Sequence, residues 1–215
     1  MVILFDLDGT LADPREGFVR CIRHALEALG RPCPSDDVLA THIGPPLEQT
    51  LGALLGPDGA HLAPQAATHY RRLYAAEGVV LTRAYDGIAR ALERLRPLAR
   101  LYVATSKPTV FACGVLEHLG LAGHFLAVHG AGPGGEGAEK GRVIHSLLER
   151  ERIDPAAAVM VGDRAQDILG AAENGLPGYG AAWGYAREGE LALAGARLVF
   201  STPEAMARHF EAPRT

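Results

Sequence analysis

Four aspartates in this chain lie at or shortly after the ends of apolar runs, where buried strands would end. Asp6 and Asp8 follow the first such run, and Asp163 and Asp167 follow a later one. Side chains two positions apart on a strand point the same way, so Asp6 and Asp8 can face one site. If a helix begins near Asp163, Asp167 lies one turn further on the same side. Carboxylates at one place repel each other unless a cation lies among them, and oxygen ligands without histidine or cysteine favour Mg²⁺ over zinc. These residues predict a magnesium site.

Aspartates also have simpler structural uses, because an Asp-Gly pair is a strong turn signal and aspartate caps helices. For Asp13 and Asp154 we favour that structural role. For Asp6, Asp8 and Asp163 together we favour a shared site. Three strand-end carboxylates from distant parts of the sequence would otherwise share one place without a neutralising charge.

Two further strand and helix ends carry groups that could hold a phosphoryl oxygen. Thr105 and Ser106 offer hydroxyls where the apolar run at residues 101–104 stops. Lys140 stands just before an amphipathic stretch and is a candidate cation for the same oxygens. Considered alone, Thr105 could merely cap the next helix and Lys140 could be a solvated surface charge.

Strands and helices in alternation must position these groups. Amphipathic patterns separate the apolar runs, and buried strands that alternate with helices are typical of a parallel sheet covered on both faces. Such sheets bind ligands beyond the carboxyl ends of their strands. The runs lie at residues 2–5, 101–104, 125–128 and 158–161, with weaker ones at 178–182 and 197–200. The sequence therefore predicts an α/β protein with a Rossmann-like parallel sheet core and helices on both faces.

Residues 14–83 break this alternation, because they carry helical patterns and no convincing strand. A stretch of that length is far too long for one crossover connection and favours an inserted domain. We therefore expect a core formed by residues 1–13 and 84–215, and an inserted α-helical cap domain formed by residues 14–83.

Composition and charge are those of a globular chain: 48% of residues are hydrophobic, 21% are charged and the formal net charge is −4. A nucleic-acid-binding surface needs a clustered positive face, so nucleic acid is not expected as a partner. No apolar run approaches the ~18 residues of a membrane span, and acidic residues interrupt the N-terminal run too early for a signal peptide. The three cysteines have no zinc spacing and leave one unpaired in any disulfide scheme. We expect reduced thiols and a soluble, cytoplasmic protein.

The motifs and their order resemble the haloacid dehalogenase superfamily, in particular its phosphoglycolate phosphatase-like branch with a helical cap. Residues 5–11, Phe-Asp-Leu-Asp-Gly-Thr-Leu, match the first motif of that superfamily without a departure. Residues 105–108 are similar to the second motif and residues 161–168 to the fourth. The third motif is weaker, because the family lysine is often followed by proline and Lys140 is followed by glycine. Lys107 is a rival for the role of that lysine.

The resemblance implies a role for each polar residue around the first motif. Asp6 would attack phosphorus and form an aspartyl-phosphate. Asp8 would protonate the leaving oxygen and then deprotonate the hydrolytic water. Mg²⁺ would bind the Asp6 carboxylate, the backbone carbonyl of Asp8 and Asp163. Gly9 and Thr10, where the chain turns toward the cap, are candidate substrate contacts.

The later motifs would supply the groups around the phosphate. The resemblance implies that Thr105 and Lys140 hold the transferring phosphoryl oxygens, where charge must be neutralised in the transition state. Ser106 is a further candidate substrate contact. Asp167 would not touch the substrate but would orient Lys140 or a metal-bound water.

Substrate choice is expected in the cap. The turn at residues 41–46 resembles the loop that this branch extends toward the active site, and we expect it to meet the leaving group together with Arg15 or Arg20. Solvated charges on a helix face are an equally good explanation of both arginines.

Asp8 favours phosphoryl transfer over dehalogenation, because an alkoxide leaving from phosphorus needs a general acid and a halide does not. The predicted function is Mg²⁺-dependent hydrolysis of a small phosphomonoester by a monomer or homodimer, with a small phosphorylated metabolite as partner. A phosphomutase or pyrophosphatase of the same superfamily is the alternative. Phosphoglycolate, nucleoside monophosphates, sugar phosphates and pyrophosphate all remain open as substrates.

One pattern indicates a different class of protein. Residues 132–137 satisfy the dinucleotide fingerprint Gly-x-Gly-x-x-Gly between a strand and a helix. They lie late in the chain, and a gap before the helix spoils the tight turn that the fingerprint needs. A dinucleotide-binding protein is therefore the distant alternative.

Overall fold

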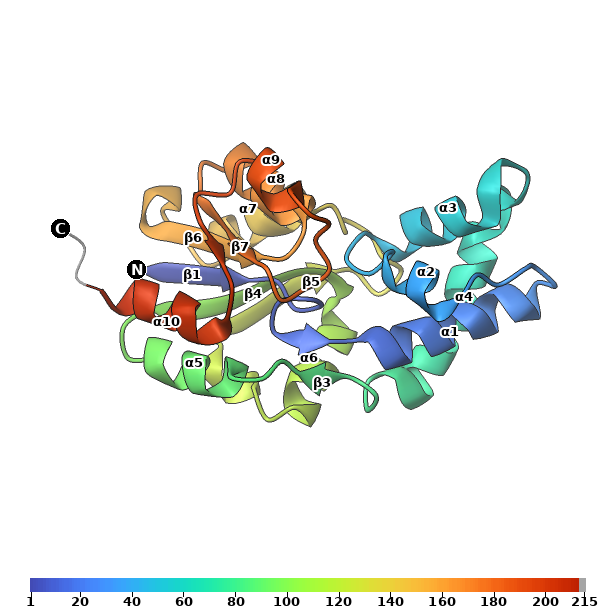
Figure 1. Ribbon diagram of the computed structural model, residues 1–215, viewed down its shortest axis with the longest axis horizontal. Coiled ribbons are helices and arrows are strands. Elements are labelled where there is room, and N and C mark those ends of the chain that lie inside the picture. The colour runs from blue at the N-terminus through green and yellow to red at the C-terminus, as the bar shows by residue number, and fades with distance from the viewer. Residues whose placement is uncertain (213–215) are drawn as a thin grey trace.

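Six parallel strands form one sheet in the order β5-β4-β1-β6-β7-β8 (Figure 1). The computed structural model describes residues 1–212. Each neighbouring pair of these strands runs parallel. The strands are β1 (Val2–Phe5), β4 (Arg100–Pro108), β5 (Ala127–Ala131), β6 (Ala158–Gly162), β7 (Gly178–Ala181) and β8 (Val199–Phe200). The predicted parallel core is confirmed, and β1 lies between β4 and β6, so the carboxyl ends of these three strands are neighbours.

Helices cover both faces of the sheet, as predicted. Ile3 and Phe5 are buried in an apolar cluster with α5, α6 and α10, whereas Val2 and Leu4 are buried in a second cluster with α7 and α8. A strand buried on both faces must be apolar throughout, which is why β1 is a continuous apolar run. The helices are α5 (Ile88–Leu95), α6 (Thr109–His118), α7 (Lys140–Arg150), α8 (Ala165–Glu173), α9 (Glu190–Leu193) and α10 (Pro203–Glu211), with 3₁₀ turns at Ala122–His124 and Pro155–Ala157.

A group of helices lies to one side of the sheet, at the right of Figure 1, between β2 (Ala12–Asp13) and β3 (Arg83–Ala84). It contains α1 (Arg15–Ala28), α2 (Asp36–Ala40), α3 (Leu47–Gly59), a 3₁₀ turn (Ala60–Leu62), α4 (Ala63–Leu73) and a π-helix (Tyr74–Gly78). Ile22, Leu26 and Leu51 belong to an apolar cluster that these helices bury among themselves. Because this cluster is distinct from those of the sheet, we propose that residues 14–83 form a cap domain on a core of residues 1–13 and 84–215.

Two local features differ from the sequence-based expectation. The strand expected at residues 125–128 begins at Ala127, because Phe125 packs edge-on against Phe5 (ring centroids 6.2 Å apart) from the preceding loop. Its hydrophobicity marks burial rather than a strand. The antiparallel pair β2–β3, where the chain enters and leaves the inserted helices, was not predicted, since two-residue strands carry no alternation. Within residues 1–212 no helix is long and apolar enough to cross a membrane.

Candidate active site

The carboxyl end of β1 brings Asp6 to the sheet edge and then turns the chain sharply. Asp6 is 3% exposed, and its backbone N–H donates to the Val161 carbonyl of β6 (2.9 Å). Leu7 is buried in the apolar cluster behind it. Gly9 has a φ of 91°, and a Cβ at this position would lie 2.1 Å from Oδ2 of Asp163. Only glycine therefore lets this loop approach the carboxylate that follows β6.

Two hydrogen bonds fix the Asp163 carboxylate. Its Oδ2 accepts from the backbone N–H of Tyr185 (2.8 Å), and its Oδ1 accepts from the Thr10 hydroxyl (3.3 Å). Gly184 passes so close that a Cβ there would lie 2.4 Å from the Asp163 Cβ. Trp183 donates its indole N–H to the Thr10 carbonyl (2.9 Å). Thr10 is thus fully buried against Asp163, and residues 183–185, whose types alone indicate only packing, form one wall of the site.

Lys140, the first residue of α7, reaches the end of β1. Its ammonium group donates to Oδ1 of Asp6 (2.7 Å) and to the Ala104 carbonyl (3.0 Å). It also forms an ion pair with Oδ1 of Asp167 (2.9 Å). Burial alone would lower the pKa of Lys140, but the charges of Asp167 and Asp6 outweigh it and raise that pKa. Lys140 is therefore a charged, buried lysine and not a solvated surface group.

Asp6, Asp163 and Asp167 form a buried carboxylate cluster whose nearest oxygen atoms all lie within 4.8 Å of one another. Burial raises the pKa of Asp163 well above its ordinary value, and the charges of Asp167 and Asp6 add to the rise. Burial likewise raises the pKa of Asp167, to about 6, although Lys140 opposes this. One ammonium against three carboxylates leaves an excess of negative charge, and the donors are all hard oxygens. This set fits a divalent cation of the Mg²⁺ type.

The end of β4 is irregular at the residues that carry hydroxyls. The register with β5 shifts between Ala104 and Pro108, a bulge of the kind that re-aims side chains beside active sites. Thr105 is 2% exposed, and its Oγ1 accepts from the backbone N–H of Lys107 (3.2 Å). The Ser106 Oγ is buried and has no hydrogen-bond partner among residues 1–212. It is therefore free for an oxygen of a bound molecule.

Lys107 follows these hydroxyls and contacts Asp8. Its ammonium group lies 2.5 Å from Oδ2 of Asp8 and 3.0 Å from the hydroxyl of Tyr74, which comes from the inserted helices. Burial raises the pKa of Asp8, and Lys107 opposes that rise. The sequence left Lys107 and Lys140 as rivals for one place, but the structure gives each its own carboxylate: Lys140 lies on Asp6 and Lys107 on Asp8.

The inserted helices close a small cavity over these groups. It encloses about 60 Å³, with the ends of β1 and β4 as its floor. The roof comes from residues 43–45, as the sequence led us to expect for the turn at 41–46, together with aromatic rings and Arg71 of α4. The side chains of Asp6, Asp8, Thr105, Ser106 and Lys107 all reach this cavity.

Arg15 and Arg20, predicted as substrate contacts, do not line that cavity. Arg15 pairs with Asp37 (2.6 Å) and Arg20 with Glu77 (2.5 Å), and both side chains are about half exposed. They line a separate hollow beside the hinge strands. The partners of charges on a helix face depend on tertiary packing, which the helical pattern does not contain.

The glycine-rich segment does not form a dinucleotide turn. Residues 132–139 separate β5 from α7, and Gly135 folds back to donate its N–H to the Gly132 carbonyl (2.9 Å). The Gly134 carbonyl accepts from Arg71 of α4 (2.8 Å). The segment therefore contacts the inserted helices instead of leading a helix N-terminus toward a pyrophosphate.

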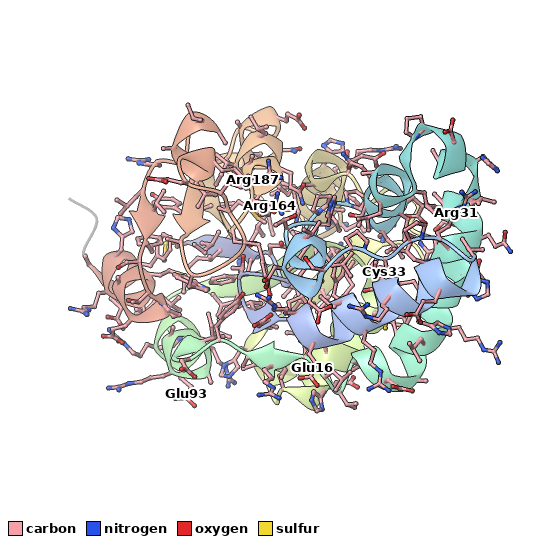
Figure 2. The ribbon with its side chains drawn as sticks, turned by 45° about the vertical axis from the view of Figure 1, so that its right-hand side comes forward. Glu16, Arg31, Cys33, Glu93, Arg164 and Arg187 are labelled. Carbon is pink, nitrogen blue, oxygen red and sulfur yellow. The ribbon has the colours of Figure 1, made fainter. Side chains whose placement is uncertain are left out.

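A second contact joins the core to the inserted helices beside Asp163. Arg164, labelled in Figure 2 at the junction of the two parts, donates to the Ile43 carbonyl in the roof of the cavity. Its Nε also donates to Glu190 (2.9 Å), the first residue of α9. Arg71 on the side of β5 and Arg164 on the side of β6 thus join the core to the inserted helices around the cavity.

Comparison with known proteins places this arrangement in a family. The sequence pattern of the haloacid dehalogenase-like hydrolases matches residues 3–180. The chain belongs to that family, as the resemblance of its motifs implies.

Several relatives have names that describe phosphate chemistry. A 5'-nucleotidase of Pseudomonas aeruginosa is 42% identical over 88% of this chain and 86% of its own length. The tyrosine-protein kinase PtkA of Mycobacterium tuberculosis is also 42% identical, over 86% of this chain but only 63% of its own length. A phosphoglycolate phosphatase of Vibrio parahaemolyticus is 29% identical over 86% of this chain and 84% of its own length.

Among solved structures, a predicted phosphatase from Clostridium acetobutylicum is similar over 97% of this chain and 96% of its own, with a TM-score of 0.92 and 34% identity. The similarity includes the inserted helices as well as the sheet, since it spans nearly the whole of both chains.

Proposed function

We propose that this chain is a Mg²⁺-dependent phosphatase that hydrolyses a small phosphomonoester through an aspartyl-phosphate on Asp6. The observation that carries the proposal is the geometry at the end of β1. Asp6 is held by Lys140 in a cluster with Asp163, and Asp8 faces the same closed cavity. Family membership and the names of the phosphatase and nucleotidase relatives support it.

In the proposed first step, a carboxylate oxygen of Asp6 attacks phosphorus while the bond from phosphorus to the leaving oxygen breaks. The proton on Asp8 moves to that leaving oxygen, so that an alcohol departs rather than an alkoxide. Lys140 and Thr105 hold the phosphoryl oxygens and neutralise charge in the transition state. In the second step Asp8 takes a proton from water, whose oxygen attacks phosphorus and releases phosphate from Asp6.

Magnesium fits the carboxylate cluster, and Asp6, Asp163 and the backbone carbonyl of Asp8 are the ligands that we propose. When bound, it would neutralise phosphoryl and carboxylate charge, which removes the repulsion between nucleophile and substrate. Asp167 would keep Lys140 in place through their ion pair (2.9 Å).

The cavity favours a small leaving group, since its volume is only about 60 Å³. Phosphoglycolate, nucleoside monophosphates, sugar phosphates and pyrophosphate remain the candidate substrates. A phosphomutase would return the phosphoryl group to the substrate and a kinase would pass it to a protein, whereas a phosphatase passes it to water. The described residues include no feature that favours either rival.

Release of inorganic phosphate therefore tests the proposal. We expect p-nitrophenyl phosphate and at least one member of a panel of metabolite esters to be hydrolysed with Mg²⁺, and not with EDTA. Asp6→Asn should abolish turnover, because an amide does not attack phosphorus. Full activity of Asp6→Asn would refute the mechanism, and transfer of phosphate to a second substrate molecule would favour the mutase.

The three cysteines are free thiols in the structure. Unpaired thiols are the usual state in a reducing compartment, and this supports the proposal of a cytoplasmic enzyme. We further propose that the enzyme acts on a small metabolite as a monomer or homodimer.

A further inference from the structure

Asp8 uses its two carboxylate oxygens differently. Oδ2 lies 2.5 Å from the ammonium group of Lys107. Oδ1 is buried and has no hydrogen-bond partner within residues 1–212. A buried carboxylate oxygen without a partner is unusual and costly. Asp8 also lines the cavity where a leaving group would be. Lys107 thus anchors one oxygen and leaves the other for proton transfer.

Local backbone geometry determines where Lys107 points. It belongs to the segment in which β4 loses register with β5, between Ala104 and Pro108. Gly130 of β5 passes so close that a Cβ there would lie 2.3 Å from the Lys107 carbonyl. The bulge turns Lys107 into the cavity, where its side chain is only 8% exposed. A regular strand would alternate and could not turn Thr105, Ser106 and Lys107 all to the cavity.

Tyr74 holds Lys107 from the other side. It is 1% exposed, begins the π-helix at the end of the inserted helices, and accepts a hydrogen bond from Lys107 (3.0 Å). The same ammonium group lies 4.7 Å from the centroid of the Tyr74 ring. Gly78 leaves the space for this ring, since a Cβ there would lie 2.3 Å from it, and π-helices frequently mark functional positions.

Neighbouring rings fix the Tyr74 side chain. Tyr70 stacks on it with ring centroids 5.5 Å apart, and Phe111 of α6 contacts it edge-on at 5.3 Å. Tyr70 belongs to the inserted helices and Phe111 to the core, so Tyr74 lies at the junction between them. Its hydroxyl reaches Lys107 only while the inserted helices lie on the sheet.

We propose that Lys107 and Tyr74 are positioning residues that place the acid–base carboxylate of Asp8 when the inserted helices are closed. Tyr74 holds the ammonium group of Lys107, and Lys107 holds Oδ2 of Asp8, so Oδ1 faces the leaving oxygen. The proton on Oδ1 then passes to that oxygen as its bond to phosphorus breaks and the bond from Asp6 to phosphorus forms. This inference rests on the proposed phosphatase function.

The choice of leaving group separates positioning of an acid from a merely structural role. A p-nitrophenolate ion is stable and departs with little help from an acid, whereas an alkoxide needs a proton. The parameter kcat/KM reports the step in which the leaving group departs. We therefore compare p-nitrophenyl phosphate with the alkyl phosphate that the wild-type enzyme hydrolyses fastest, each with saturating Mg²⁺.

Tyr74→Phe removes one hydroxyl and leaves the ring stacking intact. We expect it to lower kcat/KM for the alkyl ester by about tenfold and for the aryl ester by less than about twofold, since only the first depends strongly on the acid. Tyr102→Phe, the same deletion in an apolar cluster on β4, is the matched control and should change neither value. Circular dichroism establishes that both variants fold.

Lys107 variants test whether Tyr74 acts through this lysine. Lys107→Met should lower kcat/KM for the alkyl ester by more than Tyr74→Phe does. Lys107→Arg should keep part of that kcat/KM, because the cation remains. Adding Tyr74→Phe to Lys107→Met should have no further effect, because residues that act in series are not additive. The wild type, the two single variants and the double variant form a double-mutant cycle. The quantity compared in it is the ratio of kcat/KM for the alkyl ester to kcat/KM for the aryl ester.

Equal losses for both esters in Tyr74→Phe, or full additivity with Lys107→Met, would overturn the inference. Unchanged kinetics of Tyr74→Phe in an active enzyme would also overturn it while leaving the phosphatase proposal intact. A wild-type chain that hydrolyses no ester would instead overturn the proposed function, and the inference with it.

Discussion

Asp163→Asn removes one negative charge from the carboxylate cluster and preserves its shape. The amide oxygen can accept the N–H of Tyr185, and the amide nitrogen can donate to the Thr10 hydroxyl, so both hydrogen bonds of the wild-type side chain have counterparts. The variant therefore isolates electrostatics. We expect it to be more stable than the wild type without metal, although it replaces a buried residue of the proposed active site.

The size of this effect follows from the distances. Carboxylate oxygens within 4.8 Å of one another repel by about 3.5 kcal/mol per pair at an effective dielectric constant of ~20. Asp163 has two such neighbours, Asp6 and Asp167, and the charge of Lys140 offsets part of their repulsion. We therefore expect a gain in unfolding free energy on the order of 1–3 kcal/mol.

The gain should depend on pH. Burial, and then the charges of Asp167 and Asp6, raise the folded-state pKa of Asp163 above its ordinary value of 3.8. Below that ordinary value the group is protonated in both states, and the wild type loses no stability to it. As pH rises, the unfolded chain ionises first, and the wild type loses stability until Asp163 also ionises in the folded protein. The advantage of Asp163→Asn is thus absent at low pH and grows toward neutral pH.

Urea unfolding in EDTA measures the effect of the removed charge, and urea unfolding in Mg²⁺ measures the stabilisation by the metal. Without metal the variant should have the higher unfolding free energy at neutral pH. At a Mg²⁺ concentration of ~100 times Kd the wild type should gain about 2.7 kcal/mol, and the variant much less. Asp86→Asn, at an exposed position, is the control and should leave both values unchanged. A variant that is less stable than wild type without metal, and gains as much from Mg²⁺, would refute the charge-cluster reasoning.

Three further experiments test the site and the core of the inserted helices. Lys140→Met should lower the unfolding free energy in EDTA by about 3–5 kcal/mol, because it leaves buried carboxylates unpaired. Urea unfolding measures this change. An unchanged unfolding free energy would contradict a stabilising role for the ion pairs of Lys140. Gly9→Ala places a methyl against Asp163 at a φ of 91°, so the Mg²⁺-dependent rise in Tm should disappear; an unchanged rise would show that the loop can move aside. Burial, with a smaller contribution from Glu77, raises the pKa of Cys21 to about 12. A thiol reagent at pH 8 should therefore modify Cys21 only after unfolding. Mass spectrometry measures the modification, and a modified Cys21 in the native protein would contradict this expectation.

The sequence was most informative where a residue type is tied to a strand end. Asp6 and Asp163 could be placed at one edge of a parallel sheet because their strands are apolar on both faces and therefore easy to recognise. Lys140 was a candidate from its place before a helix, but only the resemblance favoured it over a solvated surface lysine, since nothing local distinguishes the two. The order of strands in the sheet has no local signature either, so the meeting of Lys140 with Asp6 (2.7 Å) needed the structure.

The sequence was least informative where geometry breaks a regular pattern. Lys107 faces the cavity because β4 bulges, and a bulge of this kind has no periodic signal. Residues 183–185 reach Asp163 through a backbone N–H, a group that every residue except proline has. Arg15 and Arg20 were predicted from charge alone, and their pairing with Asp37 and Glu77 is decided by how α1 packs.

The size of the closed cavity connects substrate choice to catalysis. A volume of about 60 Å³ is well below the ~300–1,000 Å³ of typical ligand pockets, so we expect the inserted helices to move off the sheet when a phosphate ester enters. We expect that movement to separate Tyr74 from Lys107, because Tyr74 belongs to the inserted helices and Lys107 to β4 of the sheet. A substrate whose leaving group prevents full closure would keep them apart, and Asp8 would then lack its anchor during the first step. The contact between Tyr74 and Lys107 thus links the size of the substrate to protonation of its leaving oxygen. A large ester should lower kcat more than it weakens binding.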